Sequence, residues 1–228
     1  MLPDKPGRVI HHFWTKESGL TSMLVFLCTV NFLIVPLFGS NPAIRVIINI
    51  LWILILLSGI FSLSRSTLNA LLFSIIPFFY VVLRFISIFN AKPFILYTDF
   101  IFGVISLITL IVMVMVRIFE PGPVTMHRIV GSIIVYILIG NFWAMIFHFM
   151  YVIFNGSFSV SFTSADFNTV HSAFLYFSFT TLTTTGFGEI LPVHSFARNL
   201  VIIEQIIGVL YPVILIGRLV SLKVEKQN

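Results

Sequence analysis

A run of threonines and glycines at 183–189 contains the residues of this chain whose types and spacing could do chemistry. It reads Thr-Thr-Thr-Gly-Phe-Gly-Glu, within the longer stretch 176–192, and lies between two long apolar segments. Gly186 and Gly188 are one residue apart, and glycine adopts positive φ without a Cβ penalty. Irregular backbone at membrane depth is tolerated only where it is buried in protein or lines water. The run therefore predicts irregular backbone that is buried in protein or lines water.

The run resembles the signature of potassium channels, Thr-x-x-Thr-x-Gly-(Tyr/Phe)-Gly-(Asp/Glu). Its six fixed places are filled here by Thr181, Thr184, Gly186, Phe187, Gly188 and Glu189. In that family, rings of backbone carbonyls from four chains replace the water shell of K⁺. The resemblance implies a selectivity filter made of Thr184, Thr185, Gly186, Phe187 and Gly188, with K⁺ held through Thr184, Thr185, Gly186 and Phe187.

The resemblance also implies roles for single side chains. The Thr184 hydroxyl would add an oxygen at the inner mouth, and Phe187 would point away from the axis and pack behind the filter. Thr181 would support the filter, and Glu189 would concentrate cations at the outer mouth. Thr185 stands where Val or Ile is commoner, and Thr180 stands where some relatives carry a glutamate. These two departures put inactivation and conductance in doubt more than selectivity.

The residues before the filter, 167–182, fit a short helix. A helix that ends at the filter directs the negative end of its dipole toward the inner cavity, where it favours a cation. We therefore expect a re-entrant pore helix followed directly by the filter.

Composition places the whole chain in a membrane, since 58% of its 228 residues are hydrophobic and only 9% are charged. A spanning helix needs about 20 apolar residues. The expected fold is an all-α membrane protein with six transmembrane helices, a re-entrant pore helix and a filter, assembled as a homotetrameric pore. The expected spans are 19–38, 43–61, 68–89, 94–119, 126–154 and 196–220.

A Glu-Pro-Gly-Pro break at 120–123 separates two expected domains. Residues 1–123 would form an N-terminal segment and a four-helix unit like a voltage sensor, and residues 124–228 would form the pore domain. The fourth span contains Asp99 and no basic residue between 98 and 116. Because steep voltage gating needs several charges that cross the field, we expect little intrinsic voltage dependence. An Arg84–Asp99 pair that holds the four helices together is favoured over a remnant sensor.

Basic residues predict the orientation, because cytoplasmic loops carry an excess of Lys and Arg. With both termini cytoplasmic, three basic residues fall outside, namely Arg45, Lys92 and Arg198, and the filter loop lies on the outer side. The cytoplasmic set is larger: Lys5, Arg8, Lys16, Arg65, Arg117, Arg128, Arg218, Lys223 and Lys226.

The last span carries the residues expected to control opening. Gly208 and Pro212 both weaken a helix, so they form a candidate gating hinge; close helix packing at Gly208 is an equally weighted alternative. Val209, Ile216 and Val220 share one helical face with Pro212 and are candidates for the cavity lining, with lipid contact as the alternative. Glu204 also lies within this span, and a pairing with His148, Asn141 or a neighbouring subunit is favoured over a role in conduction.

The expected function is passive, potassium-selective conduction across the cell membrane; a weakly selective cation channel is the alternative. The expected partners are three identical chains, membrane lipids and K⁺, with no nucleic acid and no cofactor. An enzyme is disfavoured, because no nucleophile–base pair stands out and His148, His171 and His194 have no ligand-like spacing.

Overall fold

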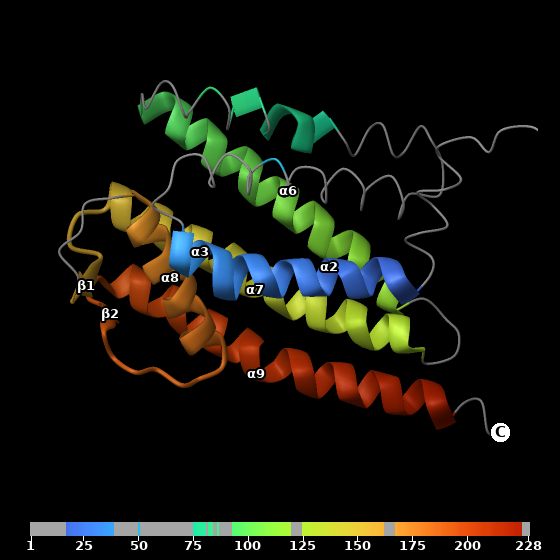
Figure 1. Ribbon diagram of the computed structural model, residues 1–228. Coiled ribbons are helices and arrows are strands. Elements are labelled where there is room, and N and C mark those ends of the chain that lie inside the picture. The colour runs from blue at the N-terminus through green and yellow to red at the C-terminus, as the bar shows by residue number, and fades with distance from the viewer. Residues whose placement is uncertain are drawn as a thin grey trace, which may run out of the picture. The chain divides into compact units, whose positions relative to one another are not determined.

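The computed structural model describes residues 17–38, 50, 75–80, 82–83, 86, 93–119, 125–161 and 167–224. The described chain is mainly helical, with one pair of short strands (Figure 1). Its residues fall into two compact units. The first unit contains the described residues up to 28, from 50 to 119 and from 125 to 135; the second contains 29–38, 136–161 and 167–224.

The first apolar segment is helical and contains one wider turn. Helix α2 (Glu17–Thr29) passes into a π-helical turn, η1 (Val30–Ile34), and then into α3 (Val35–Phe38). The Val35 N–H bonds back to the Val30 carbonyl, five residues earlier. Pro36 follows directly and has no N–H to donate to the preceding turn. The wider turn absorbs this missing hydrogen bond without ending the helical segment.

The described core of the first unit is aliphatic. Helix α6 (Pro93–Phe119) contributes Leu110, Val114 and Ile118, and α2 contributes Met23 and Leu27, all of them buried. The expected fourth span, 94–119, is thus a single helix. Asp99 is buried on α6, whereas its expected partner Arg84 lies outside the described residues.

The second unit contains the end of α7 (Met126–Ile153), α8 (Phe167–Leu182) and α9 (Ser195–Val224). Its strands, β1 (Phe158–Val160) and β2 (Ile190–Pro192), pair antiparallel with Ser159 opposite Leu191. Neither strand was predicted from the sequence. Strands of three residues carry too little alternation to be recognised from sequence.

An aromatic core fixes the position of this small sheet. The Phe158 ring of β1 lies 5.7 Å from that of Phe147 on α7 and 5.1 Å from that of Phe174 on α8, in edge-to-face geometry. Phe177 completes the group at 5.3 Å from Phe147. Each such pair contributes about 0.5–1.5 kcal/mol beyond the area that it buries. The segment between α8 and β2 is therefore held by packed structure at both ends.

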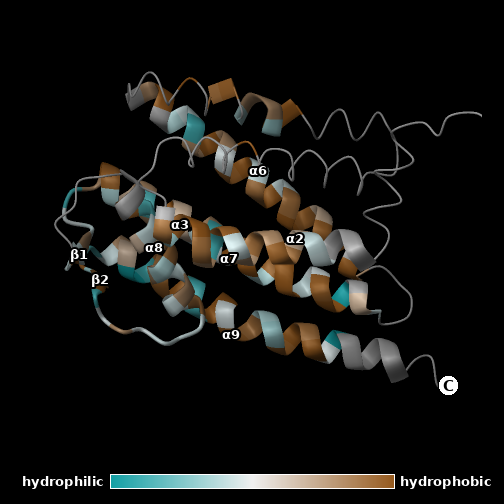
Figure 2. Cartoon of the chain, in the orientation of Figure 1, coloured by the Kyte–Doolittle hydropathy of each residue, from teal (hydrophilic) through white to brown (hydrophobic). Residues whose placement is uncertain are grey.

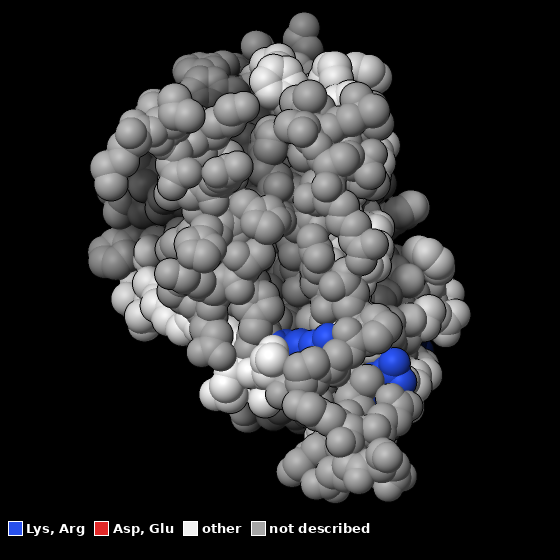
Figure 3. Space-filling view, turned by 90° about the vertical axis from the view of Figure 1, so that its right-hand side faces the viewer, with Lys and Arg blue, Asp and Glu red and all other residues white. Residues whose placement is uncertain are grey.

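Three of the described helices are long and apolar enough to cross a membrane, over Tyr97–Val116, Arg128–Ile153 and Ser195–Arg218. Figure 2 shows their largely hydrophobic colouring. A shorter apolar helix covers Thr21–Leu37. The expected second span, 43–61, and most of the third, 68–89, lie outside the described residues. Among the described side chains visible in Figure 3, those that carry charge are basic.

Candidate functional site

The residues of the predicted filter form the loop between α8 and β2 (Figure 1). Three alternate residues have positive φ, with +58° at Thr184, +56° at Gly186 and +95° at Gly188. The intervening Thr185 and Phe187 do not. A non-glycine residue in this region costs roughly 1–2 kcal/mol. The alternation thus extends to Thr184, a position where the residue type alone does not predict it.

The end of α8 holds the first half of the loop. The carbonyl of Thr180 accepts hydrogen bonds from the N–H groups of Thr185, at 2.8 Å, and Gly186, at 3.2 Å. The Thr184 N–H donates to the carbonyl of Thr181 at 2.9 Å. These bonds satisfy carbonyls that would otherwise lack partners at the helix end. The filter loop is therefore a continuation of the helix cap.

Threonine hydroxyls add a second set of contacts. The Thr183 hydroxyl donates to the carbonyl of Phe179 at 2.7 Å and lies 2.9 Å from the Thr185 hydroxyl. Thr180 uses its hydroxyl on its own helix, where it donates to the Phe177 carbonyl at 2.9 Å. Thr181 is buried. Position 180 is one of the two places where the sequence departs from the potassium-channel pattern. The Thr180 hydroxyl bonds within α8, so this side chain makes different hydrogen bonds from those of a glutamate.

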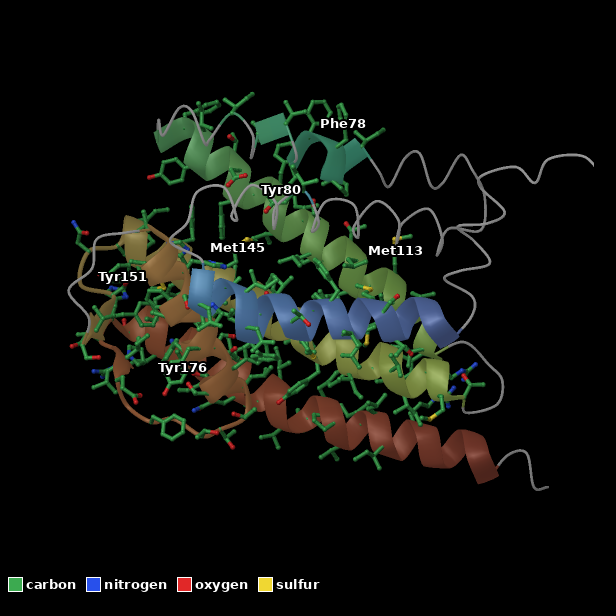
Figure 4. The ribbon with its side chains drawn as sticks, viewed as in Figure 1. Phe78, Tyr80, Met113, Met145, Tyr151 and Tyr176 are labelled. Atoms are coloured by element: carbon green, nitrogen blue, oxygen red, sulfur yellow. The ribbon has the colours of Figure 1, made fainter. Side chains whose placement is uncertain are left out.

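The outer half of the loop rests on Tyr176 of α8, labelled in Figure 4. The Tyr176 and Phe187 rings are stacked, with centroids 6.2 Å apart and planes 10° apart. The Tyr176 hydroxyl donates to Glu189 Oε1 at 3.4 Å. Desolvation raises the pKa of the Tyr176 phenol, and the Glu189 carboxylate raises it further, so the phenol keeps its proton and remains a donor. Tyr176 was not predicted from the sequence as a site residue, although its position on the helix before the filter was a possible signal.

The exit of the loop is fixed by hydrogen bonds to its backbone. The Ser157 carbonyl accepts from the N–H groups of Val193 and His194, at 2.9 and 3.3 Å. Arg198, near the start of α9, donates from Nε to the Pro192 carbonyl at 3.1 Å. With the β1–β2 pairing, these bonds leave the loop little freedom at its outer end.

Helix α9 runs unbroken through Gly208 and Pro212. A Cβ built on Gly208 would lie 1.9 Å from the carbonyl oxygen of Leu182, the last residue of α8. The same oxygen accepts a hydrogen bond from the Tyr136 hydroxyl at 3.2 Å, and Tyr136 stacks on Tyr211 of α9. Gly208 therefore permits close packing, as one of the two sequence interpretations holds, and the gating hinge stays a prediction.

The candidate cavity residues lie on an uncovered face of the single chain. Val209 and Ile216 are exposed, and Pro212 is half-buried. The side chain of Val220 lies outside the described ones. Their role as a cavity lining stays a prediction.

Glu204, also on α9, is fully buried. Its Oε1 is 2.6 Å from the hydroxyl of Ser178 on α8, which is itself 2.8 Å from the Gly140 carbonyl of α7. Among the described residues, the hydrogen-bond partner of Glu204 is Ser178 rather than the expected His148 or Asn141. Asn141 donates to the Ile137 carbonyl, and the His148 ring lies against those of His171 and Phe174. The pairing with a neighbouring subunit stays a prediction.

Two of the three histidines considered for metal binding come together. The His148 and His171 rings have centroids 5.4 Å apart. Within the described residues there is no group of three or more His, Cys, Asp or Glu side chains suited to a metal ion.

Residues 135–224 match the family model described as "Ion channel". This match supports an ion channel. The matched segment includes α8, the filter loop, both strands and α9, and it begins within α7. No curated protein matches the chain. The match and the three apolar helices together indicate a membrane protein with a channel role, which speaks against an enzyme.

Proposed function

We propose that this protein is a potassium-selective channel. The observation that carries the proposal is the alternating backbone of the loop, with positive φ at Thr184, Gly186 and Gly188 in a segment that matches ion channels. An ordinary extended strand directs successive carbonyls to opposite sides. When residues of positive and negative φ alternate, successive carbonyls point to the same side, as in carbonyl-lined ion paths.

Potassium fits such a site because the carbonyls replace its water shell. Thr184, Thr185, Gly186 and Phe187 would supply the backbone oxygens, and Thr184 would add its hydroxyl. The contacts of Tyr176 with Phe187 and Glu189 support a loop that is held in one conformation. A rigid loop of this kind favours potassium selectivity over a weakly selective cation path.

A ring of oxygens needs several copies of the loop, so we propose a homotetramer with cyclic symmetry. The exposed positions of α9, among them Val209, Val213 and Ile216, are apolar. In the tetramer such surface would face the cavity, neighbouring subunits or lipid. The six-span arrangement, the division at 123/124, the cytoplasmic termini and the location in the cell membrane belong to the same proposal.

The test is ion flux through the full chain reconstituted in liposomes. We expect uptake driven by a potassium gradient, block of that uptake by barium and little uptake driven by a sodium gradient. Native mass spectrometry of the same preparation should show four chains. Equal potassium and sodium flux would favour the weakly selective channel, and a monomer that conducts would reject the proposed pore.

A further inference from the structure

Glu204 is a buried acid in the middle of an apolar helix. It has no exposed surface in the chain and lies within the candidate span Ser195–Arg218. An ionised carboxylate in such a place is costly unless it is paired with a cation. Among the described residues, the partner of Glu204 is the neutral hydroxyl of Ser178, and Oε2 has no hydrogen-bond partner.

The number of hydrogen atoms available for these contacts indicates whether the Glu204 carboxyl is protonated or ionised. The Ser178 oxygen lies 2.8 Å from the Gly140 carbonyl and 2.6 Å from Glu204 Oε1, and both distances are typical of hydrogen bonds. The serine hydroxyl has one hydrogen, and a backbone carbonyl can only accept. If the serine donates to Gly140, the hydrogen between Ser178 and Glu204 must come from the acid. A carboxylate would leave one of these two short contacts without a hydrogen.

The described residues that contact the Glu204 carboxyl carry no positive charge. On α7 the Tyr136 phenol interacts electrostatically with Glu204 and already donates to the Leu182 carbonyl. On α8 the facing group is Ser178, and on α9 the adjacent Gln205 is neutral. Within the described part of the chain, no Lys, Arg or His bonds to the Glu204 carboxyl.

The three bonded residues belong to three different helices of the second unit. Ser178 lies one turn before Leu182, where α8 gives way to the filter loop. Gly140 belongs to α7 and Glu204 to α9. A change in this cluster therefore acts on the helix whose last carbonyls hold the loop.

We propose that Glu204 is a proton-binding site: its neutral carboxyl donates to Ser178, which donates to Gly140, and the bound proton thereby holds α8 in place behind the filter. At alkaline pH the proton passes to hydroxide, forming water and a carboxylate. The serine then has one hydrogen for two acceptors, and the tie to α7 or α9 is lost. The effect on conduction rests on the proposed channel function, whereas the proton site itself does not.

Infrared spectroscopy of the full protein in lipid tests the proton site without measuring flux. We expect a C=O stretch of a protonated carboxyl at neutral pH, its absence in Glu204→Gln, and its reversible loss in the wild type at alkaline pH. In Ser178→Ala the band should persist and shift, because the acid loses its hydrogen-bond partner. If the neutral wild type has no protonated-carboxyl band that depends on Glu204, the proposal is overturned.

Potassium flux at different pH, set equally on both sides of the membrane, tests the consequence. Wild-type flux should fall reversibly as pH rises, and Glu204→Gln should lose this dependence, since its amide keeps a donor at all pH values. Asp99→Asn removes another buried carboxyl, on α6, and should retain the alkaline loss. An unchanged pH profile in Glu204→Gln would overturn the coupling. If that variant does not assemble, Ser178→Ala replaces it, and a wild-type pH profile in Ser178→Ala also overturns the coupling.

The two measurements together separate the proton site from the channel function. An intact infrared band in a protein without potassium flux would reject the channel function and leave the proton site unaffected.

Discussion

Gly208 of α9 lies directly against the backbone carbonyl of Leu182, where α8 ends and the filter loop begins. A methyl group on Gly208 would stand 1.9 Å from that oxygen, and backbone cannot rotate away as a side chain can. Pro212, one turn later, has no N–H for the Gly208 carbonyl. The part of α9 that lacks this helical hydrogen bond thus also lies against the end of α8. A bend there would carry directly to the loop, so the packing and hinge interpretations are compatible.

Replacing Gly208 with alanine should therefore damage the protein. Alanine favours a helix by about 1 kcal/mol over glycine, but the collision with Leu182 should cost about 1–3 kcal/mol or force the helices apart. We expect less assembled protein on size-exclusion chromatography and a strong loss of potassium flux.

Gly217 is the matched control on the same helix. A Cβ there meets nothing within 4 Å, so Gly217→Ala should keep assembly and be neutral or stabilising in thermal unfolding. Wild-type assembly and flux in Gly208→Ala would contradict the close contact with Leu182.

Gly140 of α7 makes a similar contact with a side chain that can yield. A Cβ on Gly140 would lie 2.8 Å from the ring of Phe179 on α8. Gly140→Ala should lower the thermal unfolding temperature, by the equivalent of about 1–3 kcal/mol. Because the clash is with a ring, Phe179→Leu in the same chain should restore part of the loss.

A double-mutant cycle measures this coupling. The single variant Phe179→Leu is the control, since it also removes the ring contact with Phe32 at 5.1 Å. Strictly additive losses in the double variant would show that Gly140 and Phe179 do not compete for the same space.

Gly186 tests the alternating backbone of the loop. At φ of +56°, L-alanine is strained by roughly 1–2 kcal/mol, and relief of that strain would turn a carbonyl away from its neighbours. Gly186→Ala should abolish potassium flux. The measurement is flux per assembled channel, so that expression does not decide the result.

Gly156 provides the control for strain alone. It also has positive φ, of +81°, and its Cβ would meet nothing within 4 Å. Gly156→Ala should lose a comparable amount of stability and retain flux. If both variants conduct equally, the backbone alternation at Gly186 is not needed for conduction.

Much of this site was predictable because its signals are local. Helix bounds at 167–182 follow from an apolar segment that ends at a threonine- and glycine-rich run, and α8 has the same bounds. The glycine spacing predicted positive φ at Gly186 and Gly188, which is confirmed. Positive φ at Thr184 was not predictable from residue type, because the hydrogen bonds of the α8 cap impose it.

Contacts between distant segments were the part that sequence reasoning missed. Ser178 and Glu204 are 26 residues apart, and nothing in either local pattern marks them as partners. The same holds for β1 and β2, whose pairing spans the whole of α8. Such relationships depend on how α7, α8 and α9 pack, which hydrophobic periodicity alone does not determine.

Tyr176 should influence how long the filter stays conductive. Tyr176→Phe keeps the stacking on Phe187 and removes the hydrogen bond to Glu189. We expect preserved potassium selectivity and faster loss of current during sustained activity. Single-channel recording in planar bilayers measures both quantities. Tyr151→Phe is a control, because that ring packs on Phe174, away from the loop.

The pH dependence of this contact has a defined sign. The pKa of the Tyr176 phenol is raised by desolvation and then by Glu189. The neutral phenol is therefore favoured, and its contribution is present below the ordinary phenol pKa and lost as pH rises through the raised value. Tyr176→Phe should show its full effect at neutral pH and converge with the wild type at strongly alkaline pH. If Tyr176→Phe loses current at the same rate as the wild type at neutral pH, the hydrogen bond to Glu189 does not affect how long the filter conducts.

Voltage should have little direct effect on opening. Helix α6 has Asp99 and no basic residue between 98 and 116. Moving one elementary charge through the membrane field is worth about 2.3 kcal/mol per 100 mV, so steep gating requires several mobile charges. Open probability recorded against voltage in a bilayer should give a gating valence below about two elementary charges. A steeper dependence would mean that charges outside α6 move through the field, and Asp99→Asn would then separate the contribution of α6 from theirs.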